Sequence, residues 1–222
     1  MQTVKYAVDV SMVADATGSM AGLIGKVQAA ALKFHPDLAK ALEAKGKVID
    51  ELRVSFTAYR DLNFDGVHAM VQSPFYRMPT DAKAFAEFVQ GQSAFGGDDE
   101  PESGLEALDR VIASDWTKGG TKRRHVIVVW SDASTHPIGA HAADANSGFR
   151  YAKSFDELTD RWHAEGVLTR ASKRLILFTP DASGWSEIAA GWENVVHFPS
   201  KAGDGLAEVD YATILDAIQN SV

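Results

Sequence analysis

The chain has 222 residues, which is long enough to bury a full hydrophobic core as one large domain. It contains no cysteine, which excludes disulfides and thiolate metal sites, and its formal net charge of −8 argues against a general affinity for nucleic-acid backbones. The apolar runs are too short to span a bilayer, and the start of the chain has no pattern of a secretory signal. We therefore expect residues 1–222 to form a single cytoplasmic domain that binds neither nucleic acid nor membrane.

The first half of the chain alternates between strand-like and helix-like segments. Its periodicity predicts strands over 7–14, 53–59 and 67–73 and helices over 23–44 and 80–92. Pro36 is expected to kink or divide the first of these helices. The connection between the second and third strands is short, so these two strands must be antiparallel neighbours.

The second half continues the alternation. It predicts strands over 125–130, 174–179 and 194–198 and helices over 105–112, 155–164, 185–190 and 207–219. The segment 125–130 is almost continuously apolar, which is typical of a strand covered on both faces in a parallel sheet. The whole pattern predicts an α/β fold, with a mainly parallel central sheet of about six strands, one antiparallel edge strand and helices on both faces.

Oxygen-bearing side chains follow two of the predicted strands. Asp15, Thr17 and Ser19 stand at every second position after the first strand, and Asp132 follows the strand at 125–130. The carboxyl ends of neighbouring parallel strands meet at one edge of the sheet, so Asp15 and Asp132 are expected to converge there. Carboxylates and hydroxyls without cysteine favour Mg²⁺, Mn²⁺ or Ca²⁺ over Zn²⁺ or Cu²⁺.

Four stretches of the chain resemble one family. The residues from Asp15 to Ser19 are similar to the Asp-x-Ser/Thr-x-Ser signature of the von Willebrand factor type A (vWA) family, where it forms the first loop of a metal-ion-dependent adhesion site (MIDAS). Residues 57–61 (TAYRD), 96–102 (GGDDEPE) and 131–137 (SDASTHP) resemble a branch that includes the alpha-kinase-associated vWA domains. The likeness covers nearly the whole chain and implies a Rossmann-like vWA fold of bacterial type.

The resemblance implies metal ligands from three loops, namely Asp15, Thr17, Ser19, Asp99 and Asp132, with Mg²⁺ as the expected ion. Asp98 is the other candidate in the second loop, and Asp61 and His136 rank below it. Integrin-type relatives have a threonine where this chain has Asp99. An added carboxylate lowers the effective charge of the metal, which argues against integrin-like binding of a partner's acidic group.

Ordinary structural explanations exist for the same residues. Asp15 to Ser19 is also a good turn and helix N-cap, and the acids at 98–102 suit the first turn of a helix. Glu102 and Glu106 are expected to serve only that purpose. His136 and His141 lie on a loop rather than one helix face, so we expect satisfied loop histidines rather than zinc ligands.

The leading functional hypothesis is a non-catalytic, metal-dependent protein-binding module, in which a partner supplies an acidic side chain to the metal. A regulatory or assembly role beside a kinase, a phosphatase or an AAA+ ATPase is compatible with it and is implied by the family. The alternative is a metal-dependent hydrolase or phosphoryl-transfer enzyme that uses the same acids. The first motif lacks the second acid of the Asp-x-Asp-x-Thr phosphatase motif, and no Walker A loop is present.

Overall fold

The computed structural model describes residues 5–22, 24–97, 100–120, 122–141, 148–200 and 211–221. Its strands are β1 (Lys5–Asp15), β2 (Val48–Tyr59), β3 (Met70–Gln72), β4 (Tyr76–Met78), β5 (Lys122–Trp130), β6 (Lys173–Pro180) and β7 (Val195–Ser200). Its α-helices are α1 (Ile24–Ala44), α2 (Ala82–Gln90), α3 (Gly104–Ile112), α4 (Phe155–His163), α5 (Trp185–Gly191) and α6 (Tyr211–Ser221). Two 3₁₀ turns, η1 (Gly18–Gly22) and η2 (Gly66–His68), follow β1 and precede β3.

The strands form one seven-stranded mixed sheet. Its order is β3-β2-β1-β5-β6-β7, and β4 pairs with β2 beside β3. The pairs β1–β2, β1–β5, β5–β6 and β6–β7 are parallel, whereas β3 and β4 both run antiparallel to β2. The order reverses between β1 and β5, which places their carboxyl ends beside each other at a position where α/β sheets commonly bind ligands.

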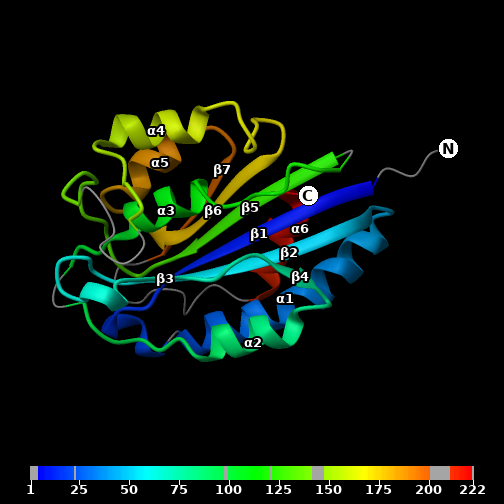
Figure 1. Ribbon diagram of the computed structural model, residues 1–222, viewed down its shortest axis with the longest axis horizontal. Helices are drawn as coiled ribbons and strands as arrows, with labels where there is room; N and C mark the ends of the chain where they lie inside the picture. The colour runs from blue at the N-terminus through cyan, green and yellow to red at the C-terminus, as the bar shows by residue number, and fades with distance from the viewer. Residues whose placement is uncertain are drawn as a thin grey trace.

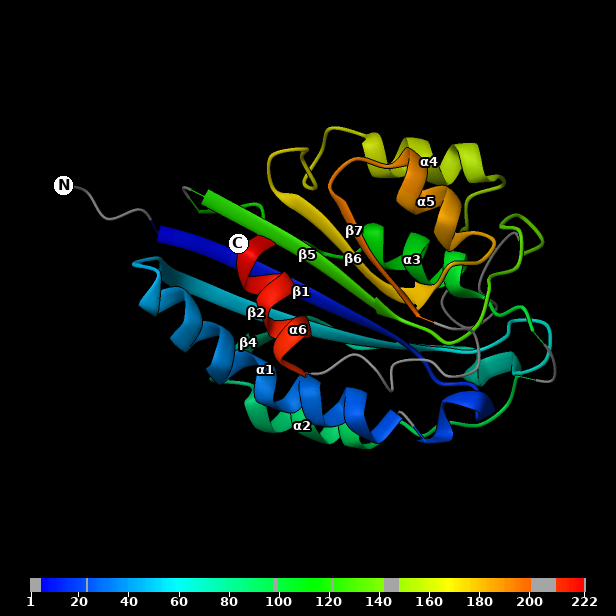
Figure 2. The ribbon, with the colours of Figure 1, turned by 180° about the vertical axis from the view of Figure 1, so that it is seen from behind.

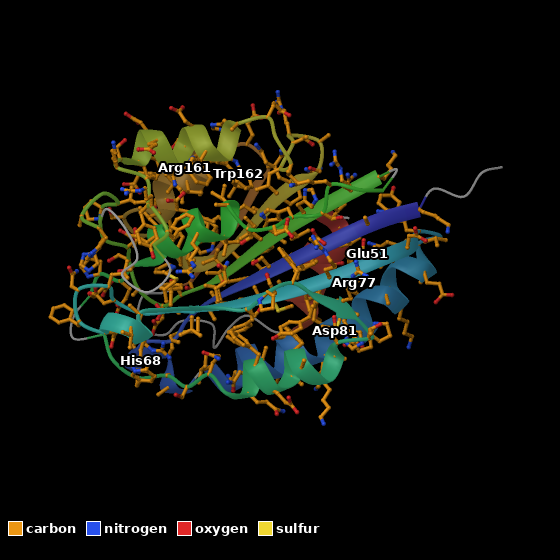
Figure 3. All side chains as sticks on the ribbon, in the orientation of Figure 1. Glu51, His68, Arg77, Asp81, Arg161 and Trp162 are labelled. Carbon is orange, nitrogen blue, oxygen red and sulfur yellow. The ribbon has the colours of Figure 1, made fainter. Side chains whose placement is uncertain are left out.

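The predicted fold class, a mainly parallel Rossmann-like vWA sheet of about six strands with one antiparallel edge strand, was wrong. The sheet has seven strands and is mixed, because the chain after β2 pairs with that strand twice. β2 is long enough for both partners, since it begins at Val48 rather than at the predicted Arg53. Arg77 of β4 lies beside Glu51 of β2, with Arg77 Nε 3.3 Å from Glu51 Oε1 (Figure 3).

Helices pack on both faces of the sheet and divide the core in two. α1, α2 and α6 lie on one face, and α3, α4 and α5 lie on the other (Figure 1, Figure 2). Successive residues of a strand point to opposite faces, so Met12 of β1 joins the first cluster and Val13 joins the second. α1 continues through Pro36, which therefore does not divide it.

Local signals explain where several helices begin. Ser154 caps α4 and its hydroxyl accepts a hydrogen bond from the backbone N–H of Glu157, which satisfies one of the unpaired donors of the first turn. The predicted final helix over 207–219 is α6, of which the described part begins at Tyr211. Within the described residues, no helix is both long enough and apolar enough to cross a membrane.

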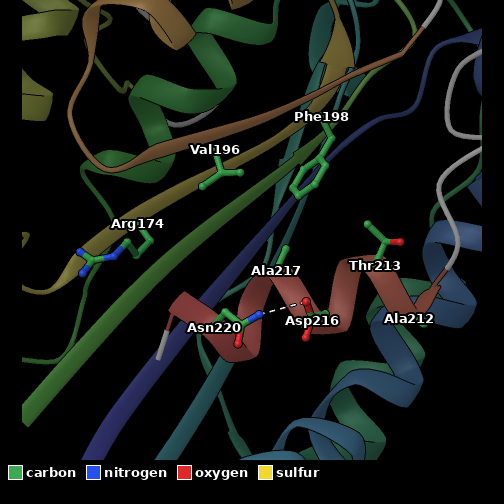
Figure 4. A pocket seen from close by; sticks show the side chains of 8 residues that line it. All are labelled: Arg174, Val196, Phe198, Ala212, Thr213, Asp216, Ala217 and Asn220. Atoms are coloured by element: carbon green, nitrogen blue, oxygen red, sulfur yellow. Dashed lines mark hydrogen bonds between the residues drawn. The ribbon is translucent and has the colours of Figure 1, made fainter.

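The outer strand β7 is only partly covered. A groove of about 620 Å³ lies between this strand and α6, with Val196 and Phe198 on one wall and Thr213 and Ala217 on the other (Figure 4). Val196 is 46% exposed. This groove lies away from the loops described next.

Candidate functional site: an acidic edge of the sheet

The carboxyl ends of β1, β2 and β5 meet at one edge of the sheet. Asp15, the last residue of β1, pairs in register with Tyr59 of β2, and the preceding Ala14 pairs with Trp130 of β5. Five carboxyl groups lie at this edge, at the end of β1, in the loops after β2 and β5, and in the loop before α3. We call them the acidic edge: Asp15, Asp61, Asp65, Glu102 and Asp132. The first and last of these are the pair that strand order predicted to converge.

Asp15 is fully buried and accepts three hydrogen bonds. Its Oδ1 receives the backbone N–H and the hydroxyl of Thr17, at 2.9 and 2.6 Å, and its Oδ2 receives the hydroxyl of Ser131 at 2.8 Å. These bonds favour the charged form, but burial outweighs them and raises the pKa of Asp15 to about 6. Ionisation of Asp15 therefore remains unfavourable, because its three donors are all neutral.

Asp132 is joined to the first loop by a serine. The hydroxyl of Ser19 donates to Asp132 Oδ1 at 2.9 Å, and the Ser19 and Thr17 hydroxyl oxygens lie 3.2 Å apart. Burial raises the pKa of Asp132 above its usual value. Ser19 is exposed, so its hydrogen bond to Asp132 lies at the solvent-facing rim of the edge.

The loop at 95–97 is fixed against the first loop by its backbone. The N–H of Gly18 donates to the carbonyl of Gly96 at 2.9 Å, and the N–H of Gly97 donates to Asp65 Oδ2 at 3.1 Å. Gly97 has φ +67°, and a Cβ there would lie 2.5 Å from Glu102 Oε1. Glycine is required at this position because both the conformation and the space exclude a side chain. The predicted ligands Asp98 and Asp99 lie outside the described residues.

Glu102 is the functional candidate that sequence reasoning missed. It forms an isolated bridge with Thr135, outside α3, and is only 5% exposed. Its Oε2 accepts no hydrogen bond from the described residues. Burial, followed by the negative charges of Asp15, Asp61, Asp65 and Asp132, raises the pKa of Glu102 to about 9. The available signal was its place directly after the acidic loop, which we had read as helix-start chemistry.

Asp61 of the acidic edge is paired with His136. His136 Nε2 lies 3.0 Å from Asp61 Oδ2 and 3.3 Å from Asn63 Nδ2, while Asp61 Oδ1 accepts the N–H of Asn63 at 2.7 Å. Asp61 is fully buried. The predicted satisfied loop histidine therefore describes His136, which spans the loops after β2 and β5.

A second buried glutamate lies deeper, on α3. Glu106 is fully buried and neither of its carboxyl oxygens accepts a hydrogen bond from the described residues. Burial raises the pKa of Glu106 to about 7, and the charges of Asp109 and Asp61 add to the shift. The expectation that Glu106 serves only as a helix-start acid does not explain this burial, because such acids normally lie in water beside the first turn.

The metal-dependent function predicted from the motifs was wrong. The structure does bring Asp15, Thr17, Ser19 and Asp132 together, but the described residues contain no group of three or more His, Asp or Glu side chains placed to hold a metal ion. Among the described residues, these hydroxyl contacts connect only two acidic side chains, Asp15 and Asp132. The ligand roles of individual residues, and the binding of a divalent cation as such, stay predictions.

The comparisons with known proteins give similarity in structure only. No protein-family model matches the chain, and no curated protein matches its sequence. The pilus adhesin SpaC from Lactobacillus rhamnosus GG is similar with a TM-score of 0.58 and 11% identity, over 99% of this chain and 31% of that one. Proximal thread matrix protein 1 from the mussel byssus is similar with a TM-score of 0.54 and 10% identity, over 98% of this chain and 48% of that one.

These findings overturn the predicted family. The absence of a matching family model, together with neighbours described as a pilus adhesin and a byssus matrix protein, contradicts membership of the vWA family and the keywords drawn from it. At 10 and 11% identity the likeness shows the fold alone. The chain spans less than half the length of either neighbour.

Proposed function

We propose that this protein is a non-catalytic binding domain of the adhesion or assembly type, and that it contacts a protein partner through the acidic edge. The observation that carries the proposal is the edge itself, where separate loops bring acids together and one of them, Glu102, has a buried carboxyl oxygen that accepts no hydrogen bond from the described residues. Its fold likeness to the pilus adhesin SpaC, over 99% of this chain, supports the same class of function. A kinase, phosphatase or AAA+ ATPase as partner and a cytoplasmic location remain predictions.

A cavity beside the acidic edge supports contact with a protein. It measures about 400 Å³, and its lining includes Leu105, Ile138 and Phe155 as well as His136, which also binds Asp61. Binding interfaces concentrate their energy where an apolar side chain fills a pocket inside a polar rim. The cavity adjoins the acidic edge at His136, so a single partner loop is able to contact both.

The chemistry of the edge favours binding over catalysis. The hydroxyls of Ser131 and Ser19 donate to carboxyl groups, and the histidine at the edge, His136, contacts Asp61 and Asn63. A serine nucleophile works with a base that is itself oriented to take its proton, typically a histidine. The negative charge of the acidic edge also repels the phosphate of a phosphoryl-transfer substrate. These features support a binding role without catalysis.

The test is site-specific photo-crosslinking. A photoreactive amino acid replaces exposed Ser19 at the acidic edge in one variant and exposed Val48, at the amino end of β2, in a matched variant. Each protein is irradiated with intact cells and culture medium of the source organism, and covalent products are identified by mass spectrometry. We expect one dominant protein partner from position 19 and no such product from position 48.

Two outcomes would contradict the proposal. Equal products from both positions would mean that the edge has no special role in contact. Turnover of a phosphate ester or glycoside by the purified domain, lost in Asp15→Asn, would show that the acids serve catalysis instead.

A further inference from the structure

We propose that the group recognised by the acidic edge is a basic side chain of the protein partner, an arginine in particular, and that Glu102 is its main ligand. The inference rests on the proposed function and names the chemistry of the partner. Two observations carry it. A carboxyl oxygen inside the acidic edge accepts no hydrogen bond from the described residues, and the buried aspartates outside the edge are paired with arginines of the chain.

Glu102 points into the acidic edge and lacks a counter-charge. Its carboxyl lies against Gly97 and Thr17, because a Cβ built on Gly97 would contact both Glu102 Oε1 and Thr17 Cβ. Oε2 is buried and accepts no hydrogen bond from the described residues. A buried carboxyl of this kind is costly to keep, and a charged donor that enters from outside removes the cost.

Elsewhere the chain pairs its buried aspartates with its own arginines. Asp9 receives Nε and Nη2 of Arg53 at 2.8 and 2.7 Å. Asp109 receives Nη1 of Arg161 at 2.8 and 2.9 Å. Arg53 binds its aspartate through two nitrogens of the planar guanidinium, whereas Arg161 places one nitrogen between the two oxygens of Asp109. The acidic edge contains no such pair among the described residues, so we infer that its arginine comes from the partner.

The nearest arginine of the chain does not fill this role. Arg60 follows β2 and is buried, but its Nη1 donates to the carbonyl of His68 and its Nη2 to the carbonyl of Ser93. Its guanidinium also stacks 3.8 Å from the ring centre of Phe95. Arg60 therefore holds two loops together and is turned to backbone carbonyls rather than to the acids.

The spread of the acids suits a guanidinium better than a metal ion. A divalent cation needs about six oxygens at roughly 2.0–2.6 Å. Hydroxyl contacts of 2.6–3.2 Å link Asp15 to Asp132, but the described residues place no group of three acidic or histidine side chains to hold a metal ion. A guanidinium presents five N–H donors over a wide plane and reaches separated acceptors at about 2.7–2.9 Å. Ser19 and Glu100 are exposed, so they form the part of this region that a partner side chain meets first from solvent. The net charge of −8 attracts such a partner over a distance.

The experiment compares a short arginine peptide with its uncharged citrulline analogue. The ¹⁵N-labelled protein is titrated at neutral pH with acetyl-Gly-Gly-Arg-Gly-Gly-amide, and in parallel with the peptide that has citrulline in place of arginine. Binding is followed through the backbone amides of Gly18, Gly97 and Ser134, which lie in three loops of the acidic edge. The amide of Thr117, which donates to Asp9 at the opposite end of the sheet, serves as an internal control.

Two matched variants locate the contact. Glu102→Gln keeps the shape of the side chain but cannot release a proton to become a carboxylate when the guanidinium binds, and we expect it to weaken arginine-peptide binding at least about tenfold. Glu43→Gln makes the same substitution at an exposed position on α1 and should leave the affinity unchanged. Thermal unfolding of both variants verifies that each is folded.

The results separate the possible explanations. Shifts at the three edge amides with arginine but not citrulline, lost in Glu102→Gln, establish the inference. Equal binding of both peptides, or arginine binding that Glu102→Gln leaves intact, overturns it. Displacement of the peptide by MgCl₂ but not by NaCl of equal ionic strength assigns the edge to a metal ion and also overturns it. If the peptide fails while position 19 still crosslinks a partner, the proposed function stands and only the basic group is wrong.

Discussion

Two buried aspartates on the same strand have opposite surroundings. Asp9 and Asp15 are both fully buried and lie six positions apart on one face of β1. Asp9 has a complete set of partners, with Arg53 bound through two nitrogens and the N–H of Thr117 at 2.7 Å. Asp15 receives only neutral donors and lies beside other acids.

The difference separates a part of the sheet where buried charge serves stability from the edge that we propose serves binding. At the amino end the charges of β1 and β2 cancel within the fold. At the carboxyl end the acids of separate loops face one another, and burial leaves Glu102 with a carboxyl that is hard to ionise. A protein that only had to fold would gain by removing those acids, so their retention at the edge points to a ligand. The following variants test this contrast.

The largest effect is expected at the amino end, from Arg53→Met. The substitution leaves the buried carboxylate of Asp9 without its cation, which should lower the free energy of unfolding by about 3–5 kcal/mol. Urea denaturation near neutral pH measures this loss. Asp15→Asn at the other end should cost much less or stabilise the protein, and a loss as large as that of Arg53→Met would contradict the contrast.

The next effect is a pH dependence at Glu102. The folded-state pKa of Glu102 is raised from 4.5 to about 9, so the folded protein binds this proton more tightly than the unfolded chain does. The stability contributed by the neutral carboxyl is fully present below about pH 4.5 and is lost as the pH rises toward 9. Glu102→Gln removes the dependence, and its free energy of unfolding should exceed that of the parent by on the order of 2–4 kcal/mol near pH 8.

The control for this prediction is the same comparison at low pH. Near pH 4.5 the glutamine and the protonated glutamate are almost equivalent, so the two proteins should unfold at nearly the same denaturant concentration. A variant that is less stable than the parent at pH 8 would show that Glu102 is ionised and stabilised within the fold.

A smaller effect is expected from a methyl group in the loop that borders the acidic edge. Gly97→Ala places a Cβ 2.5 Å from Glu102 Oε1 and keeps an unfavourable positive φ, which should cost about 1–3 kcal/mol. Gly119→Ala, in the loop before β5, meets no atom within 4 Å and serves as the matched control. Equal unfolding midpoints for the two variants would mean that the loop of Gly97 accommodates the methyl group without loss of stability.

The smallest effect is expected from Ser19→Ala. It removes the hydrogen bond to Asp132 from an exposed side chain, so the free energy of unfolding should fall by about 1 kcal/mol or less. Differential scanning calorimetry against the parent is sensitive enough to measure it. A loss similar to that of Arg53→Met would show that the rim supports the fold rather than a binding surface.

Part of the candidate site was predictable because it depends on local pattern. An apolar strand that ends in Asp15, and another that ends in Ser131 and Asp132, place these residues at the carboxyl edge of any sheet in which the strands are parallel neighbours. The pairing of β1 with β5 then brings the two aspartates together. The spacing of Thr17 and Ser19 was enough to expect their hydroxyls there.

The rest depends on contacts that no local pattern contains. Glu102 was read as part of a helix, whereas it bridges Thr135 and lies against the loop of Gly97. β4 was missed because it has only three residues, and it exists because the long β2 offers it a partner. Asp9 and Arg53 read as ordinary polar positions of two strands, and only the register of β1 with β2 makes them partners.

The most direct measurement is a titration of the side-chain carboxyl groups by ¹³C NMR, with Asp15 and Glu102 assigned through their Asn and Gln variants. We predict that Glu102 is still protonated near neutral pH and titrates at about 9, and that Asp15 titrates at about 6. Addition of the arginine peptide should lower the pKa of Glu102. Carboxyl groups that titrate near their ordinary values of about 4, with no response to the peptide, would contradict the view that the acidic edge is held unpaired for a basic partner.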